Sequence, residues 1–206
     1  MLATVLLFSY ANNASAQEIK IGTQTWATKN LDVSTFRNGD IIAEAKTDAE
    51  WEKAGDEGKP AWCYYVNDPA NGKTYGKLYN WYAVIDARGL APKGWHVPSD
   101  EEWTTLTDYL GGEEIAGIKM KSKSGWNDND GKSGGGNNSS GFAGLPGGDR
   151  YNYGSFYGIG SYGSWWSSTE SSANDAWYRN LYYLDGNVTR YGNGKHNGFS
   201  VRCLGD

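Results

Sequence analysis

The sequence is poor in the residues that build helical bundles and membrane spans. It contains only two Met and two Cys, and long aliphatic runs are few. The apolar stretch at residues 2–8 is far shorter than the roughly 20 residues that cross a bilayer. Lys and Arg form no cluster that would follow a phosphate backbone, so we expect no nucleic-acid partner and no membrane span. A charged fraction of only 21% also argues against a coiled coil or a highly charged disordered chain.

Glycine and aromatic rings are abundant instead. The 206 residues include 29 Gly, 10 Trp and 15 Tyr, and this glycine content is about twice the usual share. Such a composition predicts a compact, loop-rich fold whose core is built from rings rather than from Leu helices. The formal net charge of -5 favours solubility and does not indicate a particular class of binding partner.

Residues 1–16 are typical of a signal peptide. The apolar run is followed by Ala14 and Ala16, which place small residues before Gln17 as a signal-peptidase site requires. The usual positively charged start is missing. We expect residues 17–206 to form the mature chain, exported and folded as a single domain.

Cys63 and Cys203 are an even pair in a chain expected to be exported, which predicts one disulfide between them. A metal or redox pair is the alternative, and it needs a nearby histidine. His96 lies in the strand-like segment GWHVP and His196 in the turn KHNG, so both histidines are interpreted as structural.

Strands are predicted at both ends of the chain. Residues 18–26 alternate apolar and polar side chains around a turn at Gly22, which is the pattern of a hairpin. Residues 198–206 alternate as well, with Phe199, Val201 and Cys203 on one side. We expect the two terminal segments to lie side by side.

Two helices are predicted between these strands. Apolar residues at helical spacing favour a helix over residues 77–87. Ser99 and Glu102 form a capping box at the start of a second helix, which Gly111 and Gly112 end. Capping also explains the acidic residues there without any catalytic role.

Residues 111–163 hold more than half of the glycines and many aromatic rings, which predicts a long ordered loop. SWWSSTE, AWYRNLYYL and VTRYGNG then read as antiparallel strands, with a hairpin turn at residues 185–186. The fold class is therefore α+β, with two helices, small antiparallel sheets, adjacent termini and a long loop. Trp26, Trp81, Trp95 and Trp103 are expected in its core.

The loop over residues 124–163 carries the residues expected to bind a ligand. Rings stack on sugars while amides and carboxylates take their hydroxyls, although the same residues also serve protein interfaces. The candidates are Trp126, Asn127, Asp128, Asp130, Arg150, Tyr151, Tyr153 and Tyr157. No cofactor is expected, except that Asp128 and Asp130 are candidates for a weak calcium site.

Several segments together resemble the Fibrobacter succinogenes major paralogous domain of exported bacterial proteins. They are IGTQTWATKNLDV (21–33), YGKLYNWYAV (75–84), APKGWHVPSDEEW (91–103), GSWWSSTE (163–170) and GFSVRCL (198–204). The resemblance implies a secreted or cell-surface domain with the C-type-lectin-like fold, which formylglycine-generating enzymes share. Those enzymes hold copper with two neighbouring cysteines near the C-terminus, whereas Cys63 and Cys203 are far apart in sequence. Trp126-Asn127-Asp128 matches one lectin calcium motif, but its proline-containing partner motif is absent.

Three functions are consistent with these features. The first is a secreted, non-catalytic adhesion domain that binds a glycan or a surface protein through its aromatic loop. The second is a self-associating subunit of an extracellular assembly. An enzyme of the formylglycine-generating type comes third, because no catalytic constellation is found.

Overall fold

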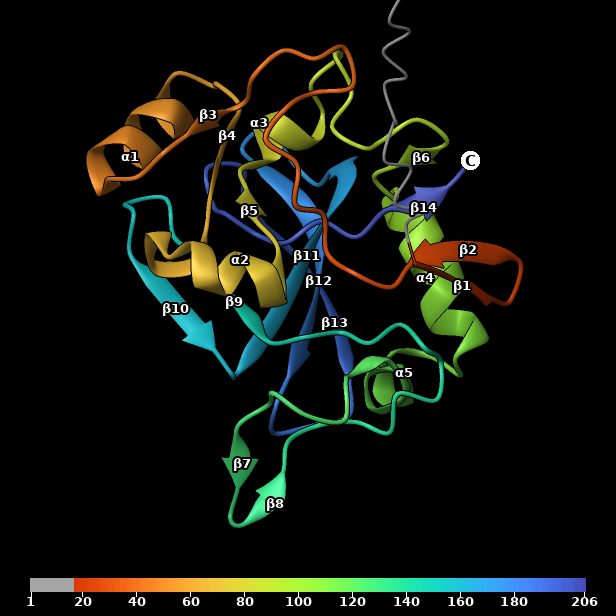
Figure 1. Ribbon diagram of the computed structural model, residues 1–206. Helices are drawn as coiled ribbons and strands as arrows, with labels where there is room; N and C mark the ends of the chain where they lie inside the picture. The colour runs from red at the N-terminus through yellow and green to blue at the C-terminus, as the bar shows by residue number, and fades with distance from the viewer. Residues whose placement is uncertain (1–16) are drawn as a thin grey trace, which may run out of the picture.

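The computed structural model describes residues 17–206, and the expected signal peptide at residues 1–16 lies outside them (Figure 1). The expected α+β class is confirmed: helices and several small sheets alternate along the described chain. The helices are α1 (Asp48–Asp56), α2 (Pro69–Tyr75), α3 (Trp81–Val84), α4 (Asp100–Tyr109) and α5 (Glu113–Met120), with a short 3-10 turn, η1 (Tyr65–Asn67).

The terminal segments meet in a four-stranded sheet. It has the order β1 (Glu18–Ile21), β2 (Gln24–Ala27), β14 (Leu204–Gly205) and β6 (Trp95–His96). The predicted hairpin is present, and Gly22 provides its turn with a φ of 62°. The last strand pairs with β2, and Ala27 N–H donates to the Cys203 carbonyl at 3.0 Å. The predicted neighbourhood of the two terminal segments is therefore confirmed.

The largest sheet crosses the centre of the molecule (Figure 1). Its order is β10 (Phe156–Ile159), β9 (Gly147–Arg150), β11 (Tyr162–Glu170), β12 (Asp175–Tyr182) and β13 (Val188–Gly194). The three strands predicted after the long loop are thus β11, β12 and β13, and they pair antiparallel as expected. The remaining small sheets are β3 (Ala43–Glu44), β4 (Ala61–Cys63) and β5 (Leu78–Tyr79), and β7 (Asp128–Asn129) with β8 (Lys132–Ser133).

The helix predicted after Pro98 is confirmed as α4. Ser99 Oγ accepts from Glu102 N–H while the Glu102 carboxylate accepts from Ser99 N–H, which completes the predicted capping box. Trp103 and Leu106 on its inner face are fully buried. Since capping and the apolar stripe are both local signals, this element could be predicted from its own residues.

The helix predicted over residues 77–87 is wrong at both ends, because only Trp81–Val84 is helical. Leu78 and Tyr79 form β5 instead, and Tyr79 exchanges backbone hydrogen bonds with Phe199. The helix α3 starts only after Asn80, whose side chain caps it by accepting from Ala83 N–H. Pairing with a distant strand has overridden the helical spacing of the apolar residues.

The two-helix expectation is also wrong, because the described chain has five α-helices. One of the missed helices, α1, carries a capping box between Thr47 and Glu50 that the sequence does display. Another, α5, lies inside the segment expected to be loop. Its Gly117 touches β-hairpin backbone so closely that a Cβ atom there would lie 2.3 Å from the Asn187 carbonyl oxygen, which explains a glycine within a helix.

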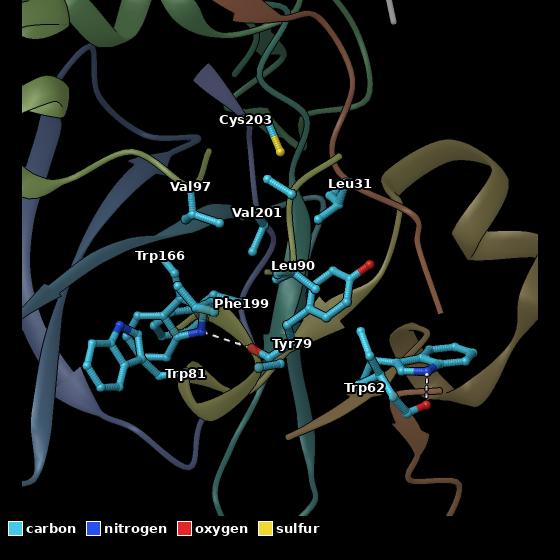
Figure 2. Close-up of a cluster of buried hydrophobic side chains, with 14 of the residues drawn as sticks. Leu31, Trp62, Tyr79, Trp81, Leu90, Val97, Trp166, Phe199, Val201 and Cys203 are labelled. Atoms are coloured by element: carbon cyan, nitrogen blue, oxygen red, sulfur yellow. Dashed lines mark hydrogen bonds between the residues drawn. The ribbon is translucent and has the colours of Figure 1, made fainter. Parts of the chain in front are cut away.

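The core consists of three clusters of buried side chains that are rich in indole rings. Trp26, Trp81 and Trp103 are buried as expected, whereas Trp95 is only partly buried. Several buried indoles donate to backbone carbonyls: Figure 2 shows Trp166 donating to the Tyr79 carbonyl, at 2.9 Å. Such bonds remove the cost of burying a polar N–H group.

The predicted disulfide is not formed. Both thiols are buried, as expected of core residues, but they are free. Cys63 on β4 packs with Ala45 and Trp51, whereas Cys203 packs in the cluster of Figure 2. The two side chains therefore enter different parts of the core, and each is enclosed by apolar neighbours.

Candidate ligand-binding groove

Three of the predicted site residues gather on the surface. Tyr151, Tyr153 and Tyr157 are all exposed, and the ring centroids of Tyr151 and Tyr157 are 4.8 Å apart. The hydroxyl of Tyr153 donates to that of Tyr157 at 3.1 Å. These rings come from β10 and the turn that precedes it, so this part of the predicted loop does present an aromatic patch.

Arg150, the predicted site residue that directly precedes Tyr151, is fully buried. Its guanidinium donates to the carbonyls of Ala45 at 2.7 Å and Gly154 at 2.8 Å, and it lies over the Trp51 ring. Arg150 therefore ties together separate loops, and its guanidinium is not presented to a ligand.

Trp126 was expected to face solvent, and this expectation is wrong. Its side chain is only 6% exposed and packs in the cluster of Trp103 and Phe142. Its indole N–H donates to Ser122 Oγ at 3.0 Å. Trp126 is therefore a core residue, although it lies in the glycine-rich segment.

Asn127, Asp128 and Asp130 lie on the β7–β8 hairpin, which projects from the molecule (Figure 1). Asp130 and Gly131 both have positive φ, 49° and 75°, as a tight two-residue hairpin turn requires. The Asn127 amide donates to Ser161 Oγ. The eight predicted residues therefore fall into separate places: the hairpin, the core and the tyrosine patch.

Within residues 17–206, no group of three or more His, Cys, Asp or Glu side chains is placed to hold a metal ion. The β7–β8 hairpin carries two acidic residues, Asp128 and Asp130. The weak calcium site remains a prediction, and a test is given below.

One concave feature of the described surface lies on one face of the largest sheet. Side chains alternate along a strand, so β11, β12 and β13 each send every second residue to the same face. On one face Trp165, Leu181 and Val188 pack against α4 and α5. On the other face, alternate residues line a cavity of about 260 Å³: Tyr162 and Ser164, Tyr178 and Asn180, and Tyr191 and Asn193.

A second cavity of about 470 Å³ adjoins the first. Tyr151, Asn193 and Asn197 line both, so the two cavities form one continuous feature that we call the tyrosine groove. The tyrosine patch therefore borders the groove through Tyr151. Tyr178 is held in place by stacking on Phe199, with ring centroids 4.6 Å apart.

Asp149 on β9 is the acidic residue of the first cavity. Its Oδ1 atom is buried and has no hydrogen-bond partner. Burial raises the pKa of this carboxyl from 3.8 to about 7. A buried carboxyl with a strongly raised pKa inside a cavity marks a candidate functional site.

Sequence reasoning missed Asp149 and most of the groove. In the segment GLPGGDR, Asp149 looks like a turn residue. The lining tyrosines and asparagines belong to three strands that were recognised individually. The alternation within each strand indicates which side chains share a face. Whether the side chains of different strands come together depends on sheet order and register, which no single segment displays.

Both histidines have structural partners, as expected. His96 Nδ1 lies 2.8 Å from Asp206 Oδ1, and its Nε2 lies 3.0 Å from Glu102 Oε1. Burial lowers the pKa of His96, but these two carboxylates outweigh it and raise the pKa overall. His196 packs against Tyr82 and also borders the second cavity.

The buried thiols are poorly suited to metal or nucleophilic chemistry. Burial raises the pKa of Cys63 and of Cys203 to about 12. Because the thiolate is the reactive form, both side chains stay protonated and unreactive at neutral pH.

The fold and the groove together define a mixed α+β domain of small sheets with a polar, ring-lined face. The chain belongs to the Fibrobacter succinogenes major domain family, whose sequence model matches residues 19–204. This confirms the family to which the sequence segments pointed. No curated protein and no solved structure matches the chain. None of the helices described for residues 17–206 is long and apolar enough to span a bilayer.

Proposed function

We propose that this chain is an exported, non-catalytic domain that binds a glycan in the tyrosine groove. The observation that carries the proposal is the groove itself, in which tyrosine rings alternate with Asn side chains around the buried, unpartnered oxygen of Asp149. Rings offer apolar faces to the C–H surfaces of a sugar, and amides and carboxylates bind its hydroxyls.

The size of the groove is consistent with this ligand class. Small-molecule sites usually enclose about 300 to 1,000 Å³, and the two adjoining cavities measure about 260 and 470 Å³. A mono- or disaccharide fits this space. The binding site we propose is thus the sheet face together with residues 149–162 of the expected loop, rather than the β7–β8 hairpin.

The proposal includes the C-type-lectin-like fold and an extracellular location. Support for the fold comes from the terminal strands joined in one sheet and from α4 packed beneath a long antiparallel sheet. Support for export comes from the signal-like residues 1–16. The same segment and the family resemblance favour a secreted or cell-surface domain.

A glycan array with the mature chain tests the proposal. Tyr191→Ala, at a position 56% exposed in the groove, should abolish or weaken every signal because it removes a stacking surface. Tyr109→Ala is the matched control, since Tyr109 is 66% exposed at the end of α4, on the far side of the sheet. Equal loss in both variants, or no glycan signal for the wild type, would contradict the proposal.

Self-association is the second candidate, and one observation favours it. The seven-residue strand β13 ends the order of the largest sheet, so its outer edge is unpaired among the described strands. Edge strands of this length readily accept a further strand. Size-exclusion chromatography across a concentration series separates the candidates, because a glycan-binding monomer elutes at one volume throughout.

A further inference from the structure

The tyrosine groove contains two buried acceptor atoms without partners. They are Asp149 Oδ1 and Asn197 Oδ1, and both residues line the first cavity. Buried polar atoms in native proteins are nearly always hydrogen-bonded. Two such atoms in one cavity indicate that a ligand supplies the missing donors.

Two of the side-chain amide donors nearby are already engaged. Asn197 Nδ2 donates to Asn193 Oδ1 at 2.7 Å, and Asn180 Nδ2 donates to Ser164 Oγ at 3.0 Å. The groove therefore has two unpartnered oxygen acceptors to offer, while these two amide groups donate to the protein itself.

The groove also has no positive charge directed at Asp149. Arg150 follows it in the chain, but its guanidinium is bound to the Ala45 and Gly154 carbonyls and to Asp48. Arg150 also lines the first cavity, but these bonds engage its guanidinium and it forms no ion pair with Asp149. Burial is accordingly the only cause of the raised pKa of Asp149.

Tyrosine rings surround this carboxyl. Tyr151, Tyr162, Tyr178 and Tyr191 all line the first cavity. The face of an aromatic ring carries a negative potential that attracts cations, and cages of such rings recognise ammonium groups. An ammonium group has three donors and no acceptor, so it complements both unpartnered oxygens as well as the rings.

We propose that the tyrosine groove selects sugars that carry a free ammonium group, and that Asp149 determines this selection. The inference rests on the proposed glycan-binding function and names the class of glycan. A neutral sugar brings no charge to Asp149, and an N-acetyl group replaces the ammonium donors by one N–H and adds a carbonyl acceptor.

A pH dependence follows from the same geometry. The cation favours the ionised carboxylate, so binding of a permanently charged ligand should tighten as pH rises through about 7. The ionisable side chains around Asp149 are Arg150, Tyr65, Tyr151, Tyr153, Tyr157, Tyr162, Tyr178 and Tyr191, with Asp175 and His196 in the adjoining cavity. Phenols are uncharged near neutral pH, so the tyrosines around Asp149 add no charge to the groove there.

Isothermal titration with four matched sugars tests the proposal: glucosamine, N,N,N-trimethylglucosamine, N-acetylglucosamine and glucose. We expect glucosamine to bind at least tenfold more tightly than the neutral pair at pH 7. The trimethylated sugar has the charge but no N–H donors, so it should bind between glucosamine and the neutral pair. Asp149→Asn should remove this preference and leave the weaker binding of neutral sugars. Affinity of the wild type for the trimethylated sugar should rise about tenfold from pH 6 to pH 8, and His196→Gln should retain that rise.

The outcomes separate this inference from the proposed function. Equal binding of all four sugars, weakened by Tyr191→Ala, overturns the ammonium selection and leaves glycan binding standing. Absence of binding by any sugar overturns both. The pH series on the wild type needs no variant, so a misfolded Asp149→Asn protein cannot obscure the result; a flat series overturns the role of Asp149.

Discussion

At the residue scale, buried arginines hold the irregular segments of this protein together. Arg150 and Arg202 are both fully buried and donate to backbone carbonyls, Arg150 to Ala45 and Arg202 to Ala27. Carbonyls outside helices and sheets need partners when buried, and a guanidinium offers five donors in a fixed plane. Arg150 was expected to bind a ligand because it lies in the predicted aromatic loop. Its burial could not be predicted, because a glycine-rich sequence does not indicate which side chains are exposed.

The burial of Trp126, which was expected to face solvent, can be tested directly. Because it is buried beside Trp103, Trp126→Ala should lower the free energy of unfolding by about 3 to 5 kcal/mol, as Trp103→Ala should. Urea unfolding measures both, with Tyr153→Ala as the exposed control expected within about 1 kcal/mol of wild type. A Trp126→Ala protein as stable as the Tyr153→Ala protein would restore the solvent-facing assignment.

Asp149 should make stability depend on pH. Its folded pKa, about 7, lies above the unfolded value, so its contribution is intact below about pH 4 and is lost as pH rises through 7. Asn carries no charge at any pH. At pH 8 we expect Asp149→Asn to be more stable than the wild type by about 2 to 4 kcal/mol, from about 1.4 kcal/mol per pKa unit. Urea unfolding at pH 4, 6 and 8 measures the difference, which should vanish at pH 4; a constant difference contradicts the assignment.

At the element scale, the parts of the fold that could be predicted are those with local signals. The helix α4 follows from its capping box, and the β1–β2 hairpin follows from alternation around Gly22. The strands β11 to β13 follow from aromatic and β-branched residues with a turn between them. None of these inferences needs knowledge of distant residues.

Elements that depend on tertiary partners were missed. The segment 77–87 is divided between β5 and α3 because Tyr79 pairs with Phe199, 120 residues away in the chain. The helix α5 follows two glycines and contains a third, at Gly117, that contacts the β12–β13 turn. In both segments, packing against a distant strand decides the local structure.

The β7–β8 hairpin carries the calcium prediction. Asp128 and Asp130 are two carboxylates on an exposed turn, so any calcium site there should be weak, of about millimolar affinity. Isothermal titration of the wild type against Asp128→Asn with Asp130→Asn tests it. Heat that the double variant lacks supports the site. No heat up to several millimolar, or heat unchanged in the double variant, removes it.

At the scale of the whole molecule, the groove arises where separate parts of the chain converge. β9, β11, β12 and β13 each contribute two residues, and Asn197 and Phe199 are added from the segment before the last strand. Sequence reasoning named the residue types, Tyr with Asn and Asp, and placed them in the loop over residues 124–163, whereas most of the groove lining lies on β11, β12 and β13. Their convergence depends on a parallel pairing between β9 and β11 that brings Asp149 beside the antiparallel strands.

The whole molecule should also be stable without a covalent cross-link. Cys63 and Cys203 pack in different clusters, and burial raises the pKa of each to about 12, so both should remain free thiols that react slowly. Thiol titration of the mature chain without reductant should find two free thiols after denaturation and almost none reactive before it. A reductant should leave the melting temperature unchanged, because the aromatic core rather than loop closure stabilises the fold. Absence of free thiols in the denatured chain, together with a lower melting temperature on reduction, would establish the disulfide and require the two segments to approach more closely.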